Sequence, residues 1–219
     1  MIVARDLHKS LLVGLILTGA RPVYLAPRIH PELEVGLGAA VQDVAAALDR
    51  HPAARLVTLV SPSHDGVATD LQGVVAAAHA RGVPVYVDEA WGPHLGFHPA
   101  LPAGAMAAGV DGAVTSTHQV LSSLSQTSVL NVRAGLVDPA RVAATVRMTQ
   151  TTSPLLALLA SLDACRQQLS TDGERLLGQA IELAADARRR LRLLPGLDVL
   201  DPDRLGLEAG RVDPLKLVV

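Results

Sequence analysis

The feature that most constrains the fold of this chain is the alternation of short apolar runs with helical patterns over its first half. Runs of five or six mostly apolar residues predict strands at Pro22–Ala26, Arg55–Val60, Val83–Val87, Asp111–Ser116 and Ser128–Val132. Helical patterns are found at Leu7–Thr18, Val41–Arg50 and Leu71–Ala80. This alternation indicates an α/β fold, a mostly parallel sheet with flanking helices, because parallel strands need crossover connections.

The second half of the chain has a different pattern. Three helices are expected, at Pro139–Thr149, Pro154–Leu169 and Asp172–Leu194, followed by strands at Leu197–Leu200 and Leu215–Val219. At the other end, the chain is expected to open almost directly on a helix, without an N-terminal strand and the loop that follows it.

Composition excludes several classes of protein. Hydrophobic residues make up 49% of the 219 residues, and the net charge of −2 gives no electrostatic footprint for nucleic acid. No apolar stretch is long enough to cross a membrane and no signal peptide is visible, so a cytoplasmic protein is expected. One cysteine excludes a cysteine-based metal site, and the His94 and His98 pair lies among glycine and prolines, so we expect no metal.

Polar side chains follow three of the predicted strands, where open α/β sheets bind their ligands. Asp88 to His94 follow one strand, Ser116 to Gln119 the next, and Ser61 to Gly66 a third. Carboxylates, imidazoles and hydroxyls beside small residues are not typical of a structural core. The sequence therefore predicts a binding site at this edge of the sheet.

These strand ends resemble those of the ornithine/lysine/arginine decarboxylases, which have the aspartate aminotransferase fold. The resemblance rests on several motifs in the family's order: RDLHKS from Arg5, LILTGARPVYL from Leu15, SPSHDGVATDL from Ser61, PVYVDEAWGPH from Pro84 and STHQVLSSLSQTSVL from Ser116. It is fainter after residue 170, although DPLKL from Asp213 also matches. The resemblance implies a partial large domain that binds pyridoxal phosphate over residues 1–170. Residues 171–219 would then be a long helix and the start of the C-terminal region.

The resemblance implies cofactor-binding roles for three residues after the Val83–Val87 run. Asp88 would face the pyridine nitrogen and keep it protonated; the alternative is a cap for the following loop. Ala90 would lie against the ring, or be an ordinary small core residue. Trp91 stands where many family members have histidine, and would either cover the pocket or be a packing residue.

Three further residues match the family's site. Ser116 and His118 correspond to phosphate-side residues, although a polar strand end without a ligand would look the same. His94 matches a second family histidine with a catalytic role, or is a hydrogen-bonding loop residue.

Gln119 is the decisive departure from the family pattern, because it occupies the position of the Schiff-base lysine. An amide nitrogen forms no Schiff base, since its lone pair is delocalised into the carbonyl. The chain has two lysines: Lys9 lies at a helix start and Lys216 in the late strand region, so neither is an obvious substitute.

The resemblance therefore implies a decarboxylase-like protein for lysine, ornithine or arginine that is inactive alone, as a degenerate or split fragment. Residues 1–4 are too few to hold the family's phosphate loop, which precedes the HKS motif. The expected partners are a small amino acid and either a second copy or a chain that supplies the missing N-terminal part. The alternative is a non-catalytic subunit that docks on an intact homologous decarboxylase.

Overall fold

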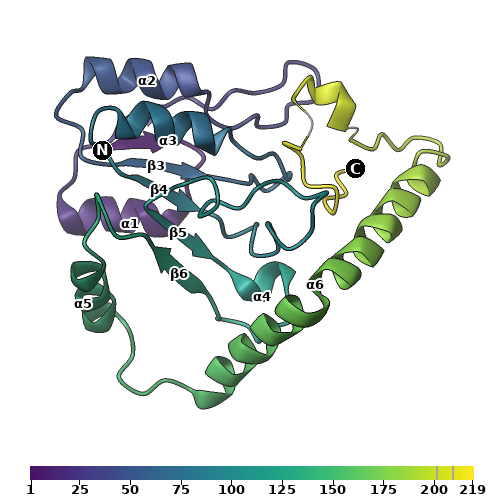
Figure 1. The fold of residues 1–219 in the computed structure, drawn as a ribbon. Helices are drawn as coiled ribbons and strands as arrows, with labels where there is room; N and C mark the ends of the chain where they lie inside the picture. Colours follow the sequence, from purple (N-terminus) through teal and green to yellow (C-terminus); the bar gives the residue numbers. More distant parts are fainter. Residues whose placement is uncertain (201, 209) are drawn as a thin grey trace.

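A computed structural model describes residues 1–200, 202–208 and 210–219. Within them, six strands form one sheet in the order β2-β1-β3-β4-β5-β6 (Figure 1). The strands are β1 (Ile2–Ala4), β2 (Val23–Leu25), β3 (Val57–Val60), β4 (Val85–Asp88), β5 (Gly112–Thr115) and β6 (Val129–Val132). The first five are parallel and β6 runs antiparallel to β5, which confirms the predicted mostly parallel sheet.

The expected opening on a helix is wrong, because the chain opens on a strand. Ile2–Ala4 form β1, which lies between β2 and β3 and whose three residues are all buried. A run of three residues is too short to show an alternation, so the sequence pattern gives no warning of it.

Three helices cover the two faces of the sheet. The chain passes from β1 through α1 (Lys9–Thr18) to β2, and returns over the opposite face through α2 (Val41–Arg50) to β3. Right-handed crossovers in opposite directions place these helices on opposite faces. Figure 1 shows α1 on one side and α2 with α3 (Leu71–His79) on the other.

The main core lies between the sheet and the α2/α3 layer. Its fully buried members include Ile2, Val57, Val85 and Val87 from the strands and Val44, Val74 and Ala78 from the helices. Because side chains alternate along a strand, the intervening residues Tyr86 and Asp88 of β4 point to the α1 side.

The cap residues explain where α1 and α3 begin. The His8 imidazole accepts a hydrogen bond from the Ser10 amide at 3.3 Å, and Asp70 accepts one from the Gly73 amide at 2.9 Å. Gly19 ends α1 with φ of 63°, a conformation that favours glycine.

One long helix replaces two of the expected ones. After α5 (Pro139–Thr149), α6 runs unbroken over the 36 residues Leu156–Leu191. The expected break falls at Ser170 and Thr171, but both hydroxyls donate to the Gln167 carbonyl inside the helix, at 2.8 and 3.0 Å. The boundary at residue 170 therefore lies within a helix, and the division into two parts stays a prediction.

The two late strands are not formed. Leu200 donates one backbone hydrogen bond to the Val218 carbonyl at 2.9 Å, and Pro202–Leu205 form a short 3₁₀ helix between them. No helix in the described ranges is long and apolar enough to cross a membrane.

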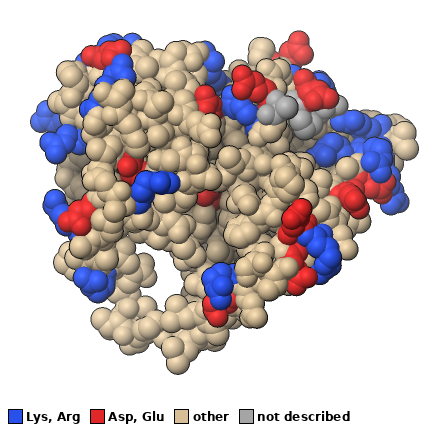
Figure 2. Space-filling view, viewed as in Figure 1, with Lys and Arg blue, Asp and Glu red and all other residues tan. Residues whose placement is uncertain are grey.

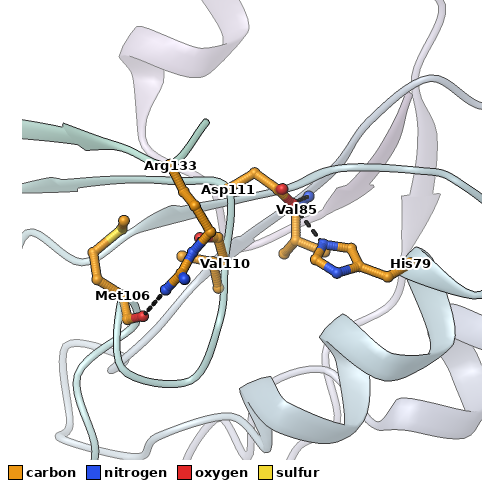
Figure 3. Close-up of polar contacts among 6 residues, drawn as sticks. All are labelled: His79, Val85, Met106, Val110, Asp111 and Arg133. Atoms are coloured by element: carbon orange, nitrogen blue, oxygen red, sulfur yellow. Dashed lines mark hydrogen bonds and ion pairs between the residues drawn. The ribbon is translucent and has the colours of Figure 1, made fainter. Parts of the chain in front are cut away.

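Asp111 ties the helix layer to the edge of the sheet where the parallel strands begin (Figure 3). It is 3% exposed, and one of its carboxylate oxygens lies 2.8 Å from both His79 Nε2 and the Val85 amide. Arg133 binds the carbonyls of Met106 and Val110 nearby. This polar cluster lies at the opposite edge from the predicted site, so its role is structural.

Charged side chains gather at the rim of the molecule and along the C-terminal part of α6, while the middle of the face seen in Figure 2 is mostly uncharged. Both signs are mixed along the rim. This distribution agrees with the absence of a basic surface in the sequence.

Candidate functional site

The sheet brings the predicted cofactor residues to one edge and one face. The register pairs Asp88 of β4 with Val114 of β5, so both side chains point to the α1 side. Ser116 lies two residues beyond Val114 in extended backbone, which places it on the same face. The candidate site is therefore the α1 side of the sheet, at the carboxyl ends of β4 and β5.

Asp88 is a half-buried carboxylate, and one of its two oxygens accepts a backbone hydrogen bond. That oxygen accepts a hydrogen bond from the Ala90 amide at 3.1 Å, which is the loop-capping contact expected as the alternative to a cofactor role. Burial raises the pKa of Asp88, while the Ala90 amide and the nearby His8 imidazole oppose the rise. A carboxylate that has lost part of its hydration favours a cationic partner over solvent.

The residues after β5 form a single helical turn, α4 (Thr117–Val120). His118 Nδ1 lies 2.7 Å from the Thr127 carbonyl, so this ring nitrogen carries a proton and donates. Thr117 is buried and donates to the same carbonyl at 3.1 Å. Gln119 is exposed, so its side-chain amide faces solvent, and its place at the Schiff-base position stays a prediction.

Trp91 lies beneath Lys216, which belongs to residues 211–219, called the C-terminal tail below. Lys216 Nζ is 4.0 Å from the centre of the Trp91 ring, and the His64 ring meets the same indole edge-on at 5.1 Å. Burial lowers the pKa of Lys216, and the charges of Asp213 and Asp65 oppose this. Lys216 belongs to the DPLKL motif, and no sequence pattern predicts Trp91 as its neighbour.

His94 is fully buried and pairs with the tail. Its Nε2 lies 2.9 Å from Asp213 Oδ2, and no atom of the described residues bonds Nδ1. The carboxylate oxygen accepts a hydrogen bond from the Nε2 proton, so the ring is held by this contact on one side only. His94 anchors the tail here, and its catalytic role stays a prediction.

The tail and the loop after β3 are built around each other. Asp213 donates its amide to the Gly66 carbonyl at 2.8 Å, and the Arg211 guanidinium binds the Ala68 carbonyl at 2.7 Å. Gly66 has φ of 86°, and a Cβ there would lie 2.6 Å from Lys216 Cγ. This position therefore needs glycine both for its backbone and for the close approach of the tail.

A cavity of about 650 Å³ lies on the opposite face from Asp88. Glu89, Thr115, Thr117 and Asn131 line it together with α6, whereas Asp88, Ser116 and His118 do not. Burial raises the pKa of Glu89 to about 7, although the Ala105 amide donates to it. Sequence reasoning missed Glu89, because only the docking of α6 shows that its side chain borders a cavity. Among the described residues, no three His, Cys, Asp or Glu side chains are placed to hold a metal.

The fold and the polar strand ends define an α/β protein with a candidate ligand site at the carboxyl edge of a mostly parallel sheet. A family model for the Orn/Lys/Arg decarboxylase major domain matches residues 1–205, and the chain belongs to this family. It is 44% identical to an arginine decarboxylase of Halalkalibacterium halodurans and 40% identical to one of Bacillus subtilis, in both cases over the whole chain. It spans 45% of the length of each relative.

Solved structures agree with this assignment. The constitutive lysine decarboxylase of E. coli superposes with a TM-score of 0.77 at 25% identity, over 92% of this chain and 31% of that one. A Sphingomonas wittichii serine palmitoyltransferase shares the fold, with a TM-score of 0.65 at 21% identity over 96% of this chain and 49% of that one.

Proposed function

We propose that this chain is a cytoplasmic, decarboxylase-like member of its family, and that its ancestors acted on basic amino acids. By itself, the chain is expected to catalyse no decarboxylation. The exposed amide of Gln119 carries this proposal. Relatives named arginine and lysine decarboxylases support the basic amino acid as the substrate class. An amide at this position provides neither a covalent anchor for an aldehyde cofactor nor a side-chain base.

The remaining residues fit pyridoxal phosphate as a non-covalent ligand. Asp88 would hold the proton on the pyridine nitrogen, because its half-buried carboxylate keeps one oxygen without a hydrogen-bond partner among the described residues. Ser116 would donate its hydroxyl to the phosphate group, and His118 would approach it with the ring nitrogen that Thr127 leaves free. Bound there, the cofactor would supply an electron-withdrawing ring.

A second candidate function is that of a non-catalytic subunit on an intact homologue, or on a chain that supplies the rest of the site. Exposed apolar side chains on the site's side of the sheet favour it. Leu12, Val13, Ile16 and Leu17 of α1 are 43–80% exposed, and Leu130 of β6 is 40% exposed. Apolar groups gathered in this way commonly mark a protein interface. Size-exclusion chromatography with light scattering tests it, using this chain mixed with a homologous arginine decarboxylase.

The proposed loss of activity is tested by adding pyridoxal phosphate to the native chain and to Gln119→Lys. The variant is expected to give a visible absorbance band that becomes permanent on borohydride treatment, with the adduct mapped to residue 119. The native chain is expected to give no such band and to release no carbon dioxide from arginine, lysine or ornithine. Gln119→Arg is the matched control, because arginine is cationic but forms no adduct.

Turnover by the native chain would refute the proposal. If neither chain binds the cofactor, Gln119 is not the only change that prevents binding. The rest of the cofactor site would then have to come from a partner chain.

A further inference from the structure

The cavity on the α2/α3 side of the sheet has the size and the walls of a small-molecule site. Its volume of about 650 Å³ lies within the usual range for such sites. Most of its walls are apolar, with Leu95, Leu121 and Val129 on the side of the sheet and Leu159, Leu162 and Leu169 on α6. Water gains few hydrogen bonds from such walls, so an apolar body is favoured inside.

One buried carboxyl group interrupts these apolar walls. Glu89 is 5% exposed, and its Oε1 accepts a hydrogen bond from the Ala105 amide at 2.6 Å. Its second oxygen has no hydrogen-bond partner within the described part of the chain, and neither has the side-chain amide of Asn131. The cavity therefore offers acceptor groups that no protein donor satisfies.

The other ionisable groups that line the cavity come from α6. Asp163 and Arg166 form an ion pair at 2.8 Å, and their side chains are 71% and 68% exposed. Cys165 lies between them and is buried. Glu89 is thus the buried carboxyl group of the cavity, whereas the exposed pair largely neutralises itself in solvent.

We propose that this cavity binds a primary alkylammonium ion, with the ammonium group on the free oxygen of Glu89 and the alkyl chain along the leucines of α6. An ammonium group supplies the hydrogen-bond donors and the positive charge that Glu89 lacks, and the chain displaces poorly bound water. A neutral alcohol would fill the apolar part of the cavity but would leave the Glu89 carboxylate without a positively charged partner. The site faces away from Asp88 and Ser116, so it does not depend on the cofactor or on Gln119.

Calorimetric titration with hexylammonium chloride tests the proposal, with 1-hexanol as the neutral comparison. The carboxyl group with a pKa of about 7 passes from about one-tenth ionised near pH 6 to about nine-tenths ionised near pH 8. Hexylammonium is therefore expected to bind up to about tenfold more tightly near pH 8, while hexanol binding does not change. Equal or pH-independent binding of the two compounds would overturn the proposal, as would no binding of hexylammonium.

Glu89→Gln and Asp163→Asn form a matched pair of variants. Each removes one carboxylate from the cavity wall at nearly constant volume, but only the first removes the buried one. The first is expected to lose the pH dependence and the second to keep it; the reverse result would place the ammonium at the rim and refute the assignment to Glu89. Should Glu89→Gln fail to fold, the comparison of hexylammonium with hexanol on the native chain still decides.

Cys165 provides an independent readout of occupancy. It is the one cysteine of the chain, it lines the cavity and it is 4% exposed. Hexylammonium is expected to slow its alkylation by iodoacetamide several-fold at fixed pH, and not in Glu89→Gln. Binding without protection of Cys165 would show that the amine sits elsewhere.

Discussion

Replacing Glu89 by glutamine should stabilise the folded chain at neutral and alkaline pH but hardly at acidic pH. The folded state keeps the Glu89 proton up to about pH 7, whereas the unfolded chain releases it near 4.5. Between these values the unfolded state binds fewer protons, so the free energy of unfolding of the native chain falls as pH rises. Raising the pKa from 4.5 to about 7 corresponds to a cost of about 3 kcal/mol, fully present above about pH 7.

Glutamine avoids this cost because it stays neutral and its carbonyl oxygen still accepts from the Ala105 amide. Urea denaturation is expected to show Glu89→Gln more stable than the native chain by about 3 kcal/mol near pH 8, and by less than about 1 kcal/mol near pH 5. Asp163→Asn is the control, because it removes a solvent-exposed carboxylate of the same cavity instead of the buried one. A stability difference for Glu89→Gln that is equal at both pH values would refute the reasoning.

Two further substitutions test the contact of the C-terminal tail with the loops that follow β3 and β4. Asp213→Ala is expected to lower the free energy of unfolding by about 2–4 kcal/mol in urea denaturation, because it leaves the buried His94 without its acceptor. Asp213→Asn keeps an acceptor oxygen and should lower it clearly less. Equal losses of stability in the two variants would contradict this reasoning. Gly66→Ala is expected to cost about 1–3 kcal/mol and to change the fluorescence of the one tryptophan, because the new Cβ meets Lys216. Gly82→Ala has a similar φ and open space around it, so a fluorescence change there as well would show that backbone strain alone is responsible.

The sequence predicts the elements whose signals are local. The bounds of α2 and α5 agree with the structure residue for residue, and α5 carries Asp138 as its cap with Pro139 in its first turn. The strands β3 to β6 lie within one or two residues of their predicted positions. Buried parallel strands such as β3, β4 and β5 appear as apolar runs, and the antiparallel, less buried β6 also has mostly apolar residues.

The errors arise where distant contacts decide the structure. β1 has three residues, and its partners β2 and β3 lie far along the chain. The contact of Lys216 with Trp91 joins residues more than a hundred positions apart, so no local pattern predicts it. Strand alternation places Asp88 and Ser116 on one face of the sheet, whereas their roles toward a cofactor stay predictions.

The adjacent residues Asp88 and Glu89, at the end of β4, point to opposite faces of the sheet. Asp88 belongs to the proposed cofactor site, and Glu89 borders the cavity under α6. Burial raises the pKa of both carboxyl groups, so both favour a cationic ligand, one an aromatic ring nitrogen and the other an alkylammonium ion. Gln119, by contrast, is exposed on a helical turn, where exchange of a lysine for glutamine costs little folding free energy. The fold and the second face therefore do not depend on the residue at position 119, so the cavity should bind its ligand whether or not the cofactor site works.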